Sequence, residues 1–157
     1  MKNFNKIILS LGSNIDDRKL HLENAVNEIS KIANLIKISS IYESDPILYD
    51  DQDKFLNIIL EIEFENSSIK LLEKIKDIEK KLGRKEIFRF GPRVIDIDII
   101  FFNNEVIKTE NLTIPHYDWK NRNFVILPLS ELFNEFISKD YKLDIQKINK
   151  VGNININ

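Results

Sequence analysis

The sequence predicts an α+β fold in which helices cover one face of an antiparallel β-sheet. Four short apolar segments have the composition or the alternation typical of strands. Two stretches with apolar residues at helical spacing lie between them. The resulting order is β-α-β-β-α-β, followed by a C-terminal extension, and this order is typical of the ferredoxin-like fold.

The first part of the chain predicts a strand, a helix and a second strand. Residues 7–11 form an apolar run that ends at Gly12, which favours a short buried strand. From Asp16 onward, apolar residues repeat at helical spacing behind an acidic start that suits the helix dipole. Residues 38–43 predict the second strand.

A loop, a third strand and a second helix are expected next. A proline and several acidic residues indicate a loop over residues 44–54. Residues 55–65 alternate between apolar and other side chains, which predicts a strand. Ser67 can cap a helix over residues 67–82, and Gly83 stands at the usual position after a helix end.

The last predicted strand covers residues 94–102 and follows a charged loop. Two asparagines after it can turn the chain into a hairpin toward Val106 and Ile107. The C-terminal extension is expected to contain a short helix over residues 128–136.

Size and composition limit the class of protein. The chain has 157 residues and a net charge of −2, which predicts one domain spanning residues 1–157 with no overall attraction for nucleic acid or anionic membranes. The absence of cysteine excludes disulfides, thiolate zinc sites and a cysteine nucleophile. No apolar run reaches the length of a cleaved signal peptide or a membrane span, so a cytoplasmic protein without membrane contact is expected.

The most informative motif is the pair of carboxylates at Asp96 and Asp98, inside an apolar strand. Side chains alternate along a strand, so the two carboxylates should share one face. The opposite face should hold the apolar residues Ile95, Ile97, Ile99 and Phe101. Two adjacent like charges are costly unless a cation offsets them, which suggests Mg²⁺ beside a phosphate-bearing ligand. A solvated strand face explains the pattern equally well, and this alternative stays open.

Three further features suit a phosphate and a ring. In residues 84–93, cationic side chains alternate with aromatic ones. Arginine donors match phosphate oxygens, and an aromatic side chain can cover a ring. A solvated surface loop is the alternative. Residues 115–124 place His116 among aromatic side chains, but with neither cysteine nor a second nearby histidine, zinc is not expected. Asn57 offers donors and an acceptor together, which suits the edge of a heterocycle.

These motifs resemble those of the 6-hydroxymethyl-7,8-dihydropterin pyrophosphokinases, folate-biosynthesis enzymes that move pyrophosphate from ATP to a pterin alcohol. The matching stretches are residues 9–14, 40–46, 55–57, 78–84, 91–99, 115–117 and 121–124. The most specific stretch is Gly91-Pro92-Arg93 running into Asp96-Ile97-Asp98. The family fold is ferredoxin-like, in agreement with the order of elements.

The resemblance implies a reaction, a cofactor and partners. The pterin hydroxymethyl oxygen would attack the β-phosphorus of ATP, and AMP would leave. Asp96 and Asp98 would hold two Mg²⁺ ions on the ATP phosphates, and Arg84 and Arg93 would hold phosphates beside them. Asp98, a water or a phosphate oxygen could accept the proton. A monomer that binds small molecules and no nucleic acid is implied.

The resemblance also implies two sets of binding residues. The pterin site would consist of Ser44, Asp45, Pro46, Ile47, Phe55, Asn57 and Phe124, with the phenylalanines on the two faces of the ring. The ATP site would consist of Leu72, Glu79, Arg84, Phe90, Arg93, Ile99, Thr113, His116, Tyr117 and Arg122. Within it, Leu72, Ile99 and Thr113 would lie near the adenine.

Four positions depart from the common pattern of the family. Phe90 replaces a usual tryptophan, which keeps an aromatic lid without the indole donor. Glu86 replaces a second loop arginine, and a lost charge-assisted hydrogen bond, about 1.5–3 kcal/mol, should weaken ATP binding. Leu48 and Asn111 replace a frequent glycine and a basic residue. None of these changes affects the carboxylate pair or the pterin sandwich.

Two other classes of protein fit part of the pattern. A phosphatase of the haloacid-dehalogenase kind also carries a strand-borne Asp-x-Asp, but early in a larger, doubly wound domain. It would form an aspartyl phosphate on Asp96. A non-catalytic ferredoxin-like module that senses a small ligand would leave the arginine loop and the carboxylates unexplained. It would bind nucleotide without Mg²⁺ dependence or turnover.

Overall fold

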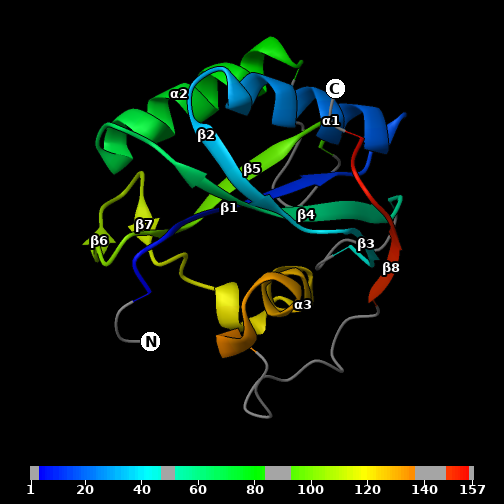
Figure 1. Ribbon diagram of the computed structural model, residues 1–157. Coiled ribbons are helices and arrows are strands. Elements are labelled where there is room, and N and C mark those ends of the chain that lie inside the picture. Colours follow the sequence, from blue (N-terminus) through cyan, green and yellow to red (C-terminus); the bar gives the residue numbers. More distant parts are fainter. Residues whose placement is uncertain (1–3, 47–51, 84–92, 137–147, 156–157) are drawn as a thin grey trace.

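The computed structural model describes residues 4–46, 52–83, 93–136 and 148–155, and its centre is a twisted sheet (Figure 1). The strands lie in the order β5-β1-β4-β3-β8, and β2 also pairs with β4. Their bounds are β1 Ile7–Ser13, β2 Asn34–Ile38, β3 Ile41–Ser44, β4 Phe55–Glu63, β5 Asp96–Phe102 and β8 Ile148–Gly152. These strands pair antiparallel, as the sequence predicts.

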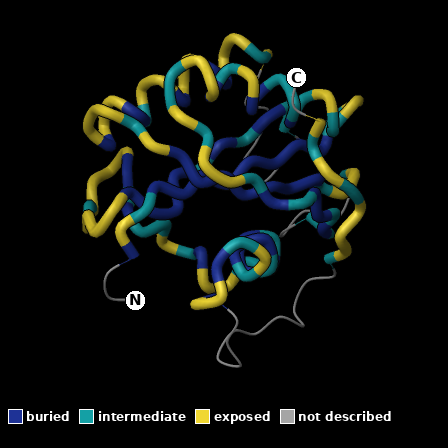
Figure 2. Tube along the Cα trace, in the orientation of Figure 1, coloured by how far each residue is buried: buried dark blue, intermediate teal, exposed yellow. Residues whose placement is uncertain are grey.

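Two helices, α1 (Arg18–Ser30) and α2 (Ser68–Lys81), cover one face of the sheet (Figure 1). Each begins behind a capping side chain, Asp17 or Ser67, that accepts a hydrogen bond from the third N–H of its helix. Gly83 follows α2 with φ of +93°, the left-handed conformation that commonly ends a helix. The main core lies between these helices and the buried central strands (Figure 2).

A third helix, α3 (Asn123–Leu132), lies against the opposite face of the sheet (Figure 1). Two single-turn 3₁₀ helices flank it, η1 (Trp119–Asn121) and η2 (Asn134–Phe136). They contribute to a second apolar cluster, whose aromatic members are Phe4, Phe101, Trp119, Phe133 and Phe136. Both faces therefore carry a layer, whereas the sequence predicted helices on one face alone.

The prediction of a helix over residues 128–136 was wrong about its bounds. The helix α3 begins at Asn123, and Pro128 lies inside it. Proline lacks the N–H that would bond to the Phe124 carbonyl, which weakens the helix near its start. The buried apolar face of α3 packs against the sheet and offsets this loss.

The predicted second strand over residues 38–43 is divided into β2 and β3. Ser39 lies between them, and its N–H donates to the Ile59 carbonyl at 2.9 Å. Its hydroxyl accepts a hydrogen bond from the Ile59 N–H, also at 2.9 Å. The Ser39 side chain thus replaces a backbone carbonyl at the break, and both strands still pair with β4.

A bulge in β5 changes which face its last residues occupy. In the register with β1, Leu9 pairs with Ile99 and Ile8 pairs with Phe101, so one residue of β5 is extra. An extra residue reverses the alternation beyond it. The prediction that Phe101 shares a face with Ile99 was therefore wrong, because Phe101 packs in the α3 cluster and Phe102 packs in the main core.

The chain after β5 leaves the sheet. A turn closes with a hydrogen bond from the Glu105 N–H to the Phe102 carbonyl at 3.1 Å. The next strand, β6 (Ile107–Lys108), pairs with β7 (Thr113–Ile114) in a separate ribbon. The predicted turn is present, but the strand after it pairs with β7.

The C-terminal strand β8 joins the edge of the sheet beside β3. Lys150 Nζ of β8 lies 3.6 Å from Glu131 Oε1 of α3, and this oxygen accepts a hydrogen bond from Tyr42 Oη of β3 at 2.7 Å. The contacts connect β8, α3 and β3. Over the described ranges, the helices lack the combination of length and apolar character that a bilayer span requires.

Candidate functional site

The polar residues of the site meet on the sheet face opposite α1 and α2. Gly12 of β1 lies in register between Asn57 of β4 and Asp96 of β5. Two residues earlier, Ser10 pairs with Asp98 of β5. Directly paired residues of antiparallel strands point to the same side, so Asn57 and both carboxylates share one face. The prediction that Asp96 and Asp98 share a face is confirmed.

Glu79 of α2 supports the strand between the two carboxylates. Its side chain is buried, and its Oε2 accepts a hydrogen bond from the Ile97 N–H at 2.9 Å. Lys76 Nζ lies 3.5 Å from Oε1 of the same carboxylate. Because β5 pairs with β1 along one edge, Glu79 satisfies a backbone donor on its other edge.

The pKa of Asp98 is shifted by its surroundings. Burial first, and the Asp96 charge second, raise the pKa of Asp98 from 3.8 to about 7. The Arg122 guanidinium acts in the opposite direction. A bound cation would favour the ionised form of Asp98 and offset the repulsion between the carboxylates.

The donor chemistry at this position fits Mg²⁺. Mg²⁺ is commonly held by one or two carboxylates, with substrate phosphates and waters as its other ligands. Asp96 and Asp98 would supply those carboxylates. In the part of the chain that the structure describes, no group of three or more histidine, aspartate or glutamate side chains is arranged to hold a metal.

His116 lies beside β5, where its backbone N–H donates to the Ile100 carbonyl at 2.9 Å. Burial first, and the Arg122 cation second, lower the pKa of His116 from 6.5 to about 4. Its Nδ1 accepts a hydrogen bond from the Asp118 N–H at 3.1 Å, and its ring stacks on Tyr117 with centroids 4.7 Å apart. A neutral imidazole whose Nδ1 accepts carries its proton on Nε2, so His116 offers one donor at neutral pH.

Arg122 lies near two aromatic residues predicted for different ligands. Its guanidinium carbon is 5.9 Å from the centroid of the Tyr117 ring and 5.4 Å from that of the Phe124 ring. Its Nε lies 3.3 Å from Asp118 Oδ2. One cation therefore lies within about 6 Å of an aromatic residue predicted for ATP and of one predicted for the pterin.

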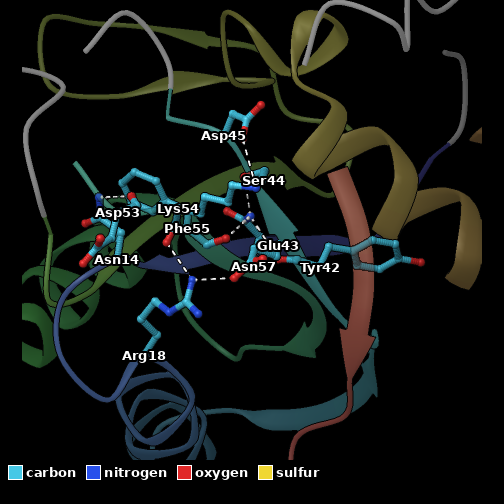
Figure 3. Close-up of polar contacts among 10 residues, drawn as sticks. All are labelled: Asn14, Arg18, Tyr42, Glu43, Ser44, Asp45, Asp53, Lys54, Phe55 and Asn57. Carbon is cyan, nitrogen blue, oxygen red and sulfur yellow. Dashed lines mark hydrogen bonds and ion pairs between the residues drawn. The ribbon is translucent and has the colours of Figure 1, made fainter. Parts of the chain in front are cut away.

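Asn57 is the buried amide at the other side of the site (Figure 3). Its Nδ2 donates to Ser44 Oγ at 2.7 Å and to the Tyr42 carbonyl at 3.2 Å. A Cβ built on Gly12 would lie 3.3 Å from Asn57 Oδ1 and 3.4 Å from Phe55 Cδ1. Gly12 therefore leaves space for the pair. The prediction that the first strand stops at Gly12 was wrong, because β1 continues through this glycine to Ser13.

Asn14 connects the two sides of the site, and it was not predicted as a site residue. Its buried side chain donates from Nδ2 to Gln52 Oε1 at 2.8 Å and to the Asp53 carbonyl at 3.0 Å. Its Oδ1 accepts a hydrogen bond from the Arg93 N–H at 2.7 Å. Asn14 ends the first matching stretch of the chain, which was the only signal in the sequence.

The other predicted residues are placed at several depths. Asp45 and Pro46 are half-buried, and Asp45 Oδ1 lies 3.7 Å from Lys54 Nζ. Leu72 packs against the main core, and Ile99 is buried within it. Thr113 is half-buried on β7, and Asn111 is exposed. Outside the described residues lie Ile47, Leu48, Arg84, Glu86 and Phe90.

Known proteins resemble the chain in sequence and in fold. Residues 8–134 match the family described as 7,8-dihydro-6-hydroxymethylpterin-pyrophosphokinase, HPPK. The 2-amino-4-hydroxy-6-hydroxymethyldihydropteridine pyrophosphokinase of Haemophilus influenzae is 41% identical over 131 residues, which cover 82% of each chain. The Bacillus subtilis protein of the same name is 45% identical over 126 residues, which cover 79% of this chain and 75% of that one.

A solved structure supports the fold. The wild-type HPPK-DHPS of Plasmodium falciparum with SDX-DHP superposes with a TM-score of 0.64 at 21% identity, covering 90% of this chain and 41% of that one. Fold and sequence together define an enzyme of the diphosphokinase class. The chain belongs to the HPPK family, whose activity is part of folate biosynthesis.

Proposed function

We propose that this protein transfers the terminal diphosphate of ATP to 6-hydroxymethyl-7,8-dihydropterin and releases AMP. The observation that carries the proposal is the register at Gly12, which has Asn57 on one side and Asp96 on the other. Neighbouring strands lie about 4.8 Å apart, so these two side chains start about 10 Å apart. This spacing suits a ring bound at Asn57 whose hydroxymethyl group reaches a phosphate bound near Asp96.

The pterin site is assigned to the face around Asn57. Phe55 and Phe124 hold the two faces of the ring, and residues 44–47 complete the pocket. The donors of the Asn57 amide already bind Ser44 and Tyr42. This orientation directs Oδ1 as an acceptor for the N–H groups at the edge of a pterin.

The ATP site is assigned to the face around β5 and to the segment after β7. Asp96 and Asp98 hold two Mg²⁺ ions, which when bound neutralise charge on the phosphates. The other ATP contacts are assigned to Leu72, Glu79, Arg84, Phe90, Arg93, Ile99, Thr113, His116, Tyr117 and Arg122. The proton on His116 Nε2 supports this assignment, because a phosphate or ribose oxygen can accept it.

In the proposed reaction, the hydroxymethyl oxygen forms a bond to the β-phosphorus of ATP. The bond from this phosphorus to the α,β-bridging oxygen breaks, and AMP leaves with the electron pair. The hydroxyl proton passes to Asp98, to a water or to a phosphate oxygen. The aromatic sandwich holds the attacking oxygen in position. Arg93 and Arg122 favour the negative charge that moves onto the leaving group.

The proposal includes the organisation of the chain. Residues 1–157 act as one pyrophosphokinase domain that is monomeric and cytoplasmic. We classify its topology as ferredoxin-like, and the strand order β5-β1-β4-β3 supports this classification.

Product analysis tests the proposed function. The purified protein is incubated with ATP, Mg²⁺ and the reduced pterin alcohol, and the nucleotides are separated. We expect equal amounts of AMP and the pterin diphosphate ester. The 6-methyl analogue, which lacks the attacking hydroxyl, is the control and should yield no AMP. ADP as the product would indicate an ordinary kinase, and the absence of turnover would indicate a binding module; either result contradicts the proposal.

A further inference from the structure

Arg18, the first residue of α1, contacts both β3 and the residue just before β4. Its Nη1 donates to Glu43 Oε2 of β3 at 2.8 Å and to the Lys54 carbonyl at 2.8 Å (Figure 3). A terminal guanidinium nitrogen carries two protons, so one nitrogen can serve both acceptors. The Arg18 and Glu43 side chains are each 28% exposed, so solvent screens this pair less than a pair on the open surface.

The two acceptors lie where β3 ends and β4 begins. Glu43 pairs with Leu56, and Ser44 pairs with Phe55. The Leu56 side chain packs in the core beneath α1 and α2, so Glu43 points to that helix-covered face. Successive residues alternate, so Ser44 and Phe55 point to the face of the candidate site.

Arg18 therefore lies across the sheet from the proposed pterin site and acts on it through the backbone. The Lys54 carbonyl belongs to the peptide group that precedes Phe55. The Glu43 backbone precedes Ser44, whose hydroxyl accepts a hydrogen bond from Asn57. Loss of the guanidinium would free both positions and change the directions of the Phe55 and Ser44 side chains.

We propose that Arg18 is a positioning residue for the pterin site, holding the ends of β3 and β4 together from the opposite face of the sheet. The inference rests on the proposed function for the identity of the ligand. It predicts a selective effect, because both acceptors of Arg18, Glu43 and the Lys54 carbonyl, directly precede residues assigned to the pterin site.

Three variants test the inference. Arg18→Ala removes both hydrogen bonds, Arg18→Lys keeps the charge but not the planar fork, and Glu43→Gln keeps an acceptor without the ion pair. Lys19→Ala is the matched control, since it removes the same charge from the next residue of α1. Thermal unfolding of each variant is measured first, and kinetics are compared at a temperature at which all are folded.

The readouts separate pterin binding from ATP binding. For Arg18→Ala we expect the KM and the Kd for the pterin to rise about tenfold, with the KM for ATP within about twofold of wild type. Arg18→Lys and Glu43→Gln should give intermediate increases, and Lys19→Ala should match wild type. If Arg18→Ala does not fold, Arg18→Lys and Glu43→Gln test the inference instead: the KM for the pterin should rise while the KM for ATP stays near that of wild type.

Equal increases in both KM values, or wild-type pterin binding in the Arg18 and Glu43 variants, would overturn the inference. Failure of the proposed function gives a different result. In that case the wild-type protein itself produces no AMP from ATP and the pterin alcohol. Wild-type turnover with an insensitive Arg18 would refute the positioning role alone.

Discussion

Asn14 and Arg93 are joined by two hydrogen bonds that fix the entry to β5. The Asn14 N–H donates to the Arg93 carbonyl at 3.0 Å, and the Arg93 N–H donates to Asn14 Oδ1 at 2.7 Å. Asn14 Nδ2 also holds Gln52 and the Asp53 carbonyl. One buried amide therefore connects the segment before β4, on the proposed pterin side, with the segment before Asp96.

Asn14→Ala should reduce both stability and activity. The variant removes the partner of the Arg93 N–H and of Gln52 Oε1, both part-buried, and each lost hydrogen bond costs about 0.5–1.5 kcal/mol, so the free energy of unfolding should fall measurably. Misplacement of Arg93 should lower kcat/KM by about tenfold or more. Asn14→Asp keeps the acceptor for the Arg93 N–H and loses the donors, so it separates the two connections. Wild-type unfolding and kinetics in Asn14→Ala would contradict the connecting role.

Gly12→Ala should weaken pterin binding selectively. The added Cβ would lie 3.3 Å from Asn57 Oδ1, so the amide must move from its position. Overpacking of this kind costs about 1–3 kcal/mol, and we expect the KM for the pterin to rise about tenfold. Gly152→Ala is the matched control, because a Cβ there has nothing within 4 Å. Steady-state kinetics with each substrate varied in turn give the comparison, and equal behaviour of the two variants would refute the spacing argument.

Asp96→Ala should abolish transfer while leaving pterin binding largely intact. Removing one of the two carboxylates proposed to hold Mg²⁺ should lower turnover by about a hundredfold or more. Asp96→Asn retains the shape of the side chain and controls for packing. AMP release and calorimetry with the pterin are the two measurements. Full turnover in Asp96→Ala would refute the proposed metal role.

The raised pKa of Asp98 predicts a pH-dependent stability in metal-free protein. Between pH 3.8 and about 7, folded Asp98 keeps a proton that the unfolded chain has lost, so the free energy of unfolding falls as pH rises. His116 acts oppositely: its pKa is lowered to about 4, so protonation of the unfolded chain reduces stability below pH 6.5. Asp98→Asn removes the first contribution and leaves the second.

Urea unfolding in the presence of a chelator measures how the free energy of unfolding changes with pH. We measure the free energy of unfolding of Asp98→Asn minus that of wild type. This difference should be larger at about pH 8 than at about pH 5, because only the ionised carboxylate is unfavourable in the folded protein. Addition of Mg²⁺ at the higher pH should stabilise wild type more than the variant. A difference between the proteins that does not change with pH would contradict the electrostatic account.

Local patterns were sufficient to predict much of the fold. Ser67 and Gly83 mark the two ends of α2 because their chemistry is local. The break at Ser39 and the bulge that moves Phe101 depend on neighbouring strands, so alternation alone gave the wrong result for both. The start of α3 was missed because its packing against the sheet outweighs the effect of Pro128.

Some features of the candidate site also follow from local patterns, and others do not. That Asp96 and Asp98 share a face follows from the period of a strand. Contacts such as Arg18 with Glu43, or Asn14 with Arg93, join residues far apart in the chain. They depend on the register and on the turn between β1 and α1, which local sequence patterns do not specify.

The most direct test of the central claim follows the β-phosphorus of ATP. With ATP labelled at this phosphorus, Mg²⁺ and the reduced pterin alcohol, we expect the label to appear in the pterin product while unlabelled AMP is released. Retention of the label in ADP would mean that only the terminal phosphate moves, and would contradict the account.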